Sequence, residues 1–186
     1  GKEKCPMTEI EKEIPKSQYK TKEHEKAVVK DITDNWLIRS VNSKFHAILA
    51  TNSIKEAINY YRIFKEFDTN FNVTAIFDPS DNNSNTAIDK IDGVTEILTD
   101  YNNKFRKKYN ITQYESFKKD VCLRLAHKAP YLTIERNQNE QLNLVIVVDQ
   151  LLTGFDSKWI NTLYMDKEQE NKNLIQSISR TNRIFG

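Results

Sequence analysis

One apolar run constrains the fold of this chain more than any other feature. Residues 142–149, LNLVIVVD, are almost continuously hydrophobic and rich in β-branched side chains. A strand with one face in solvent alternates apolar and polar residues, whereas a strand covered on both faces is apolar throughout. We therefore expect this run to be an interior strand of a parallel sheet that is covered by helices.

Weaker patterns on either side supply the other elements. Short apolar runs predict strands at 44–50, 72–77 and 162–166. Apolar residues at helical spacing predict helices at 19–41, around 94–105, around 117–125 and at 171–184. A capping box formed by Ser53 and Glu56 predicts the start of a further helix. Strands that alternate with helices, without an internal repeat, favour a doubly wound α/β domain. Residues 129–141 show no clear period, and residues 80–85 are polar enough for a surface loop.

The length of 186 residues suits a single domain with a real core. Residues 1–18 contain Pro6 and Pro15 and no sustained apolar period, so we interpret them as a linker and place the domain at 19–186.

Charge and cysteine content exclude little. There are 28 basic and 26 acidic residues, a net charge of +2 that neither demands nor excludes a nucleic-acid partner. The basic run 104–108 is typical of a solvated helix face. Cys5 and Cys122 lack a CxxC spacing, so we expect no zinc site. No segment resembles a signal peptide or a membrane span, and we expect a soluble, cytoplasmic protein.

In open parallel sheets, ligands gather at the carboxyl ends of the strands. Gly154 and Asp156 follow the strongest strand, where glycine permits close backbone approach and a carboxylate accepts hydrogen bonds from a ribose. The alternative is that Gly154 ends a helix and Asp156 caps the next one.

The final predicted helix, 173–185, presents one polar face. At about 100° per residue, Gln176, Arg180 and Arg183 cluster on one side and the apolar residues lie opposite. Guanidinium groups on a rigid element match phosphate oxygens and stay charged at physiological pH. The alternative is two surface arginines on an ordinary amphipathic helix.

Together these segments resemble motifs V and VI of superfamily 2 helicases, the last of which has the form Q-x-x-G-R-x-x-R. Here it reads QSISRTNR over residues 176–183, with Ser179 in place of the glycine. The sequence is still more similar to the restriction (R) subunit of type I restriction-modification enzymes, in which VVD-x-LLTGFD, NTLYxDK and NLIQ-x-ISR-x-NR segments follow one another. All three occur here in order between Val147 and Arg183. Residues 44–53 resemble motif IV, and the overall similarity extends over residues 20–186.

The resemblance implies the second RecA-like motor domain of an ATP-dependent translocase acting on double-stranded DNA. It implies arginine fingers at Arg180 and Arg183, which in such enzymes stabilise transition-state charge at the γ-phosphate of ATP. The remaining implied roles are nucleotide contacts by Gln176, Gly154 and Asp156, and contacts to the DNA backbone by Thr51, Ser53 and Thr153.

The sequence contains neither a G-x-x-x-x-G-K-[ST] phosphate loop nor a DEAD-like acidic box for magnesium. By the resemblance, ATP and Mg²⁺ are bound mainly by a first motor domain, cleavage belongs to a separate nuclease domain, and methyltransferase and specificity subunits are partners. We expect no appreciable ATPase or endonuclease activity from this chain alone. The alternatives are a motor domain of another superfamily 2 translocase or helicase, and a non-catalytic assembly module.

Overall fold

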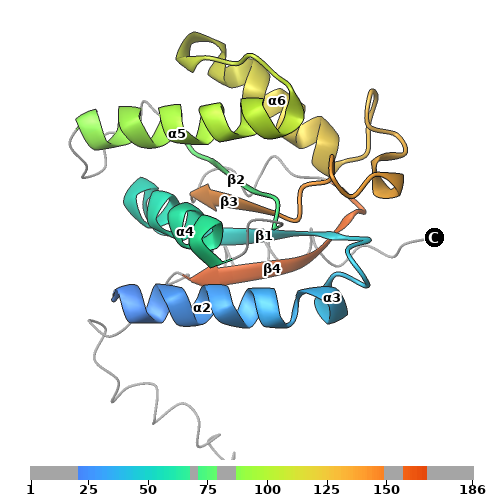
Figure 1. The fold of residues 1–186 in the computed structure, drawn as a ribbon, viewed down its shortest axis with the longest axis horizontal. Coiled ribbons are helices and arrows are strands. Elements are labelled where there is room, and N and C mark those ends of the chain that lie inside the picture. Colours follow the sequence, from blue (N-terminus) through green and yellow to red (C-terminus); the bar gives the residue numbers. More distant parts are fainter. Residues whose placement is uncertain (1–20, 68–70, 79–86, 149–156, 167–186) are drawn as a thin grey trace, which may run out of the picture.

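The computed structural model describes residues 21–67, 71–78, 87–148 and 157–166. Within them, four parallel strands form one sheet in the order β2-β3-β1-β4 (Figure 1). The strands are β1 (His46–Thr51), β2 (Val73–Ile76), β3 (Leu144–Val148) and β4 (Ile160–Asp166). The α/β class with a parallel sheet, expected from the sequence, is confirmed and is consistent with a RecA-like fold.

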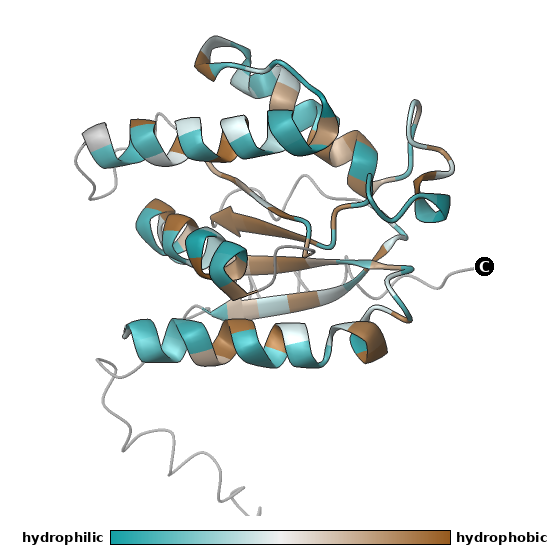
Figure 2. Cartoon of the chain, in the orientation of Figure 1, coloured by the Kyte–Doolittle hydropathy of each residue, from teal (hydrophilic) through white to brown (hydrophobic). Residues whose placement is uncertain are grey.

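The strand that the sequence predicts to be interior, β3, lies inside the described sheet, as does its neighbour β1. β3 pairs with β1 on one side and with β2 on the other. Its residues from Leu144 to Val147 are fully buried, which is why the run tolerates no polar alternation. Figure 2 shows the hydrophobic colouring of β3, whereas the colouring of β4 and of the helices is mixed.

The described helices surround this sheet in one connected core. They are α2 (Lys22–Asp34), α3 (Trp36–Arg39), α4 (Ile54–Phe67), α5 (Ala87–Phe105) and α6 (Tyr114–Leu125), with 3-10 turns η2 (Ile111–Gln113) and η3 (Ile134–Arg136). α4 packs on β1, β2 and β3, while α2 lies against α4 and α5 contacts both α4 and β2. The periodic apolar residues of α4 point inward as expected, with Ile54, Ile58 and Tyr61 all buried, whereas Leu37 of the first predicted helix is 61% exposed.

The first predicted helix is wrong as one continuous element, because the structure divides it at Asn35. The Asn35 side chain donates to the carbonyl oxygen and the carboxylate of Asp31, both at 2.9 Å. A short amide side chain that bonds the preceding turn competes with the helical backbone and favours termination. α2 therefore ends at Asp34, and the short helix α3 follows.

β4 begins at Ile160, two residues before the predicted start. Its register against β1 shifts between His46 and Ala47, whose partners are Ile160 and Thr162. Asn161 is the extra residue of this irregularity, so the strand starts earlier than its apolar pattern suggests.

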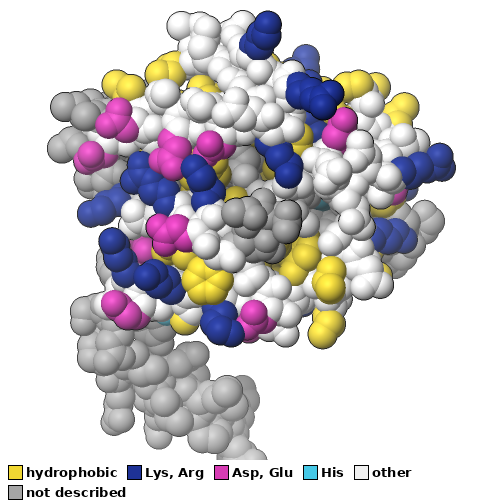
Figure 3. All heavy atoms as spheres, in the orientation of Figure 1, with side chains coloured by type: hydrophobic (Ala, Val, Ile, Leu, Met, Phe, Trp, Pro, Cys, Tyr) yellow, Lys and Arg dark blue, Asp and Glu magenta, His cyan; other side chains and the backbone are white. Residues whose placement is uncertain are grey.

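The predicted linker at 1–18, the polar loop at 80–85 and the helix at 171–184 lie outside the described residues. No helix in the described ranges is long and apolar enough to cross a membrane. On the face drawn in Figure 3, basic and acidic side chains are interspersed, in keeping with the small net charge of +2.

Candidate functional site

The register of the sheet places three strand ends side by side. Thr51, the last residue of β1, pairs with Val148 of β3 on one side and with Asp166 of β4 on the other. Because the strands are parallel, all three chains leave the sheet at the same edge. The segments that carry the family resemblance therefore meet at this edge, because 147–156 starts there beside β1 and 161–167 ends there on the other side of β1.

Thr51 is fully buried at this edge. Its hydroxyl lies 3.3 Å from the carbonyl oxygen of Val147 and 3.4 Å from that of Ser53, and it donates to these oxygens. The hydroxyl thus ties the end of β1 to β3. Its assignment as a contact to a DNA backbone stays a prediction, and such a contact would require the side chain to exchange its present acceptors for a phosphate.

Ser53 caps the amino end of α4, as the sequence predicts. Its Oγ accepts a hydrogen bond of 3.2 Å from the backbone N–H of Glu56. The Glu56 carboxylate accepts at 3.0 Å from the N–H of Asn52, one residue before the position that an ordinary capping box uses. The cap directs the positive end of the α4 dipole toward the strand-end edge, where it favours an anion.

Asp166 is held at this edge by three elements. Its Oδ1 accepts from Nε2 of His24 in α2 at 2.9 Å, and its Oδ2 accepts from the hydroxyl of Tyr60 in α4 at 2.5 Å. Asn52 donates to its carbonyl oxygen at 3.2 Å. Both the side chain and the backbone of Asp166 are therefore restrained at the point where the chain leaves β4.

Tyr60 and Glu25 continue this polar cluster into the interior. Burial, reinforced by the hydrogen bond to Asp166, raises the pKa of the Tyr60 phenol far above its usual range, so Tyr60 remains a donor. Glu25 is 6% exposed, and its Oε2 has no hydrogen-bond partner among the described residues. Burial raises the pKa of Glu25, and the negative charges of Glu56 and Asp166 raise it further.

Sequence reasoning missed this cluster. His24 and Asp166 are separated by 142 positions and Tyr60 and Asp166 by 106, so no local pattern joins them. The one available signal was the position of Asp166 at the end of a predicted strand. The predicted site residues Thr153, Gly154, Asp156, Gln176, Arg180 and Arg183 lie outside the described residues.

A second buried polar group lies at the opposite edge, where β1 begins. The Nδ1–H of His46 donates to the carbonyl oxygen of Leu142, and Nε2 of His46 lies 2.8 Å from Nε2 of His127. His127 also bonds Glu135 at 3.1 Å and stacks on Trp159 with the ring centroids 3.8 Å apart. Burial lowers the pKa of His46 to about 3.

Across the described part of the chain, no group of three His, Cys, Asp or Glu residues could hold a metal ion.

Comparisons with known proteins show the family to which this chain is similar. Residues 43–186 match the family described as type I restriction enzyme subunit R domain 3. A type I restriction enzyme endonuclease subunit of Staphylococcus aureus is 27% identical over 165 residues, covering 84% of this chain but 17% of that protein. The HindI endonuclease subunit of Haemophilus influenzae is 48% identical over 56 residues, covering 28% of this chain and 5% of that protein. A putative type I restriction enzyme endonuclease subunit of Methanocaldococcus jannaschii is 44% identical over 50 residues, covering 27% of this chain and 5% of that protein.

Proposed function

This chain belongs to the family of type I restriction enzyme R subunits, and from that premise we propose that it is the second RecA-like motor domain of such a subunit. In this proposal the domain couples ATP hydrolysis to the translocation of double-stranded DNA, and a separate nuclease domain cuts the DNA. The chain spans 17% of the length of its Staphylococcus aureus relative, so the complete activity belongs to a larger protein.

The observation that carries the proposal is the common edge of β3, β1 and β4. The pairing of Thr51 with Val148 and Asp166 brings the start of the segment 147–156 and the end of the segment 161–167 next to the capped end of α4. Ligands of open parallel sheets bind at this edge. A chain that concentrates its family-specific sequence there has the layout of a nucleotide-dependent motor.

The residue roles follow from the family segments. Arg180 and Arg183 act as arginine fingers at the γ-phosphate, and Gln176, Gly154 and Asp156 contact the nucleotide. Thr51, Ser53 and Thr153 are the proposed contacts to the DNA backbone, with the Thr51 hydroxyl leaving its present acceptors, and contacts of this kind suit movement along any sequence.

ATP and Mg²⁺ are bound mainly by the first motor domain of the parent chain. The geometry at Asp166 supports this division, because both of its carboxylate oxygens already accept hydrogen bonds, from His24 and Tyr60, and neither is left as a ready metal ligand. Mg²⁺ prefers oxygen ligands with several waters and substrate phosphates. The second motor domain, to which we assign this chain, contributes the opposite wall of the nucleotide cleft.

The proposal is tested by ATP hydrolysis of the full-length parent subunit, with and without DNA and with and without methyltransferase and specificity subunits. Hydrolysis that requires DNA and the assembled complex is the expected result. Equal turnover by the parent subunit alone with DNA would indicate another superfamily 2 translocase. No turnover under any condition would indicate an assembly module without catalysis.

A further inference from the structure

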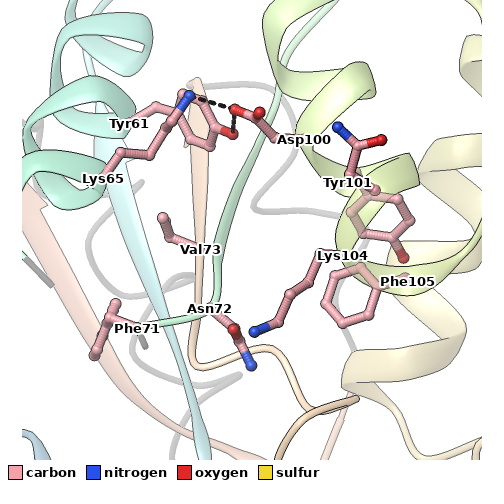
Figure 4. A pocket seen from close by; sticks show the side chains of 10 residues that line it. Tyr61, Lys65, Phe71, Asn72, Val73, Asp100, Tyr101, Lys104 and Phe105 are labelled. Carbon is pink, nitrogen blue, oxygen red and sulfur yellow. Dashed lines mark hydrogen bonds and ion pairs between the residues drawn. The ribbon is translucent and has the colours of Figure 1, made fainter. Parts of the chain in front are cut away.

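A pocket lies on the side of the domain away from the candidate site. It is formed between α4 and α5 beside the start of β2, and its volume is about 420 Å³ (Figure 4). Because all strands are parallel, the start of β2 lies at the edge opposite Thr51. The pocket is therefore separate from the edge to which the motor function is assigned.

The floor and one wall of the pocket are aromatic. Phe71 lines one side, with its ring stacked on Phe64 at a centroid distance of 5.3 Å and an interplanar angle of 9°. Phe105 lines the other side, and the buried guanidinium of Arg124 lies 4.0 Å from the centre of its ring. Both rings are fixed by their neighbours before any ligand arrives, which reduces the entropy lost on binding.

Polar groups form one end of the pocket, and their charges are paired with one another. The hydroxyl of Tyr61 donates to Asp100 at 2.6 Å, and Lys65 donates to Asp100 at 2.5 Å (Figure 4). Lys65 also donates to Glu96 at 3.1 Å. The Asp100 carboxylate is thereby neutralised by an adjacent ammonium group. This end of the pocket offers no free anion to attract a cationic ligand.

Lys104 supplies the remaining charge. Its side chain is exposed and lines the pocket, and in Figure 4 the ammonium group extends into the space opposite Asn72. Within the described ranges Lys104 forms no ion pair, and the same holds for the exposed cations Arg106 and Lys108 that follow it. The basic run 104–108, which the sequence analysis treated as a solvated helix face, thus places one uncompensated positive charge at the mouth of an aromatic pocket.

We propose that this pocket binds an acidic protein segment, which inserts an apolar side chain between Phe71 and Phe105 and places a carboxylate on Lys104. A volume of about 420 Å³ accommodates one large side chain with its flanking backbone, and it falls within the size range of ordinary ligand pockets. A carboxylate on an ammonium group forms a charge-assisted hydrogen bond, and the apolar side chain gains by burial.

A nucleic acid fits the same charge but not the same shape. Stacking of a base requires an open ring face, and Phe71 is only 8% exposed. The pocket also lies at the edge opposite the proposed DNA contacts Thr51 and Ser53; this second argument alone rests on the proposed function.

The test uses the full 186-residue chain labelled with ¹⁵N. The probe is the peptide acetyl-Glu-Phe-Glu-Leu-Glu-amide, and a peptide with alanine in place of Phe and Leu serves as the comparison. The first peptide is expected to shift the amide resonances of Phe71, Lys104 and Phe105 in a saturable manner, and the alanine peptide to bind more weakly. Lys104→Glu should weaken binding by roughly tenfold or more, the effect of losing one charged hydrogen bond.

Lys108→Glu is the matched control, since it makes the same charge change in the same basic run but does not line the pocket. Its effect should be less than about threefold, as expected for a distant exposed charge. Asn103→Trp places a large ring on an exposed pocket residue without disturbing the core, and it should block the peptide.

Three outcomes would overturn the proposal: no saturable shift at the pocket, equal losses in the Lys104→Glu and Lys108→Glu variants, or tighter binding of oligothymidylate than of the peptide at the same residues. None of these outcomes depends on ATP hydrolysis, so the test is independent of the motor assignment.

Discussion

The hydrogen bond between Tyr60 and Asp166 leads to a quantitative prediction for Tyr60→Phe. Tyr60 is fully buried, and its hydroxyl donates at 2.5 Å to a carboxylate. Hydrogen bonds to charged groups contribute about 1.5–3 kcal/mol to stability. The Asp166 side chain is 21% exposed and keeps its bond from His24, so water can partly replace the lost donor. We therefore expect a loss near the lower limit, about 1.5 kcal/mol.

Urea unfolding followed by circular dichroism measures this loss in the full chain. With a slope of about 2 kcal/mol per molar urea, the midpoint should fall by roughly 0.75 M. Tyr164→Phe is the matched control, because the Tyr164 hydroxyl is buried and no carboxylate accepts a hydrogen bond from it among the described residues. That variant should stay within about 0.5 kcal/mol of the parent.

A double-mutant cycle with Asp166→Asn isolates the pair. A coupling energy of about 1 kcal/mol is expected for groups in direct contact. Equal midpoints for Tyr60→Phe and Tyr164→Phe, or a coupling near zero, would refute the view that Tyr60 anchors the end of β4.

Two further predictions concern stability. Burial lowers the pKa of His46 in the folded chain to about 3, whereas its ordinary pKa in the unfolded chain is about 6.5. Below pH 6.5 the unfolded chain therefore binds more protons than the folded chain. The contribution of His46 to stability is complete above that pH and declines as the pH falls. Between pH 8 and pH 5, His46 alone should account for a loss of about 2 kcal/mol, and His46→Gln should flatten the profile; an unchanged profile would contradict the assignment. In α5, an added Cβ at Gly93 would lie 2.4 Å from Cδ1 of the buried Ile58. Gly93→Ala should therefore lower the unfolding free energy by about 1–2 kcal/mol, although alanine has the better helix propensity. The loss should be smaller in an Ile58→Val background. A more stable Gly93→Ala chain would show that Ile58 can move.

The sequence predicted the elements whose signal is local. The apolar run at 142–149 identified β3 as an interior strand because burial on both faces removes polar alternation. Ser53 and Glu56 identified the start of α4 because a cap depends on residues three positions apart. The break at Asn35 was missed, since the apolar spacing continues through it while the side chain of Asn35 bonds the preceding turn.

The tertiary arrangement of the site was beyond local reasoning. His24 and Tyr60 meet Asp166 only because α2 packs on α4 and β4 pairs with β1. His24 also lies before residues 43–186, the part that matches the family model. The resemblance therefore identified the segments at the strand ends, while the contacts that hold Asp166 in place required the fold.

The most direct test of the motor assignment is DNA-stimulated ATP hydrolysis by the assembled enzyme carrying Arg180→Ala or Arg183→Ala in the full-length subunit. Arg136→Ala, at an exposed position in η3, is the matched control. The account predicts that the Arg180→Ala and Arg183→Ala variants lose roughly 10³-fold or more in turnover, the effect of removing an arginine finger, with DNA binding retained and Arg136→Ala unchanged. Normal turnover by Arg180→Ala and Arg183→Ala would contradict it.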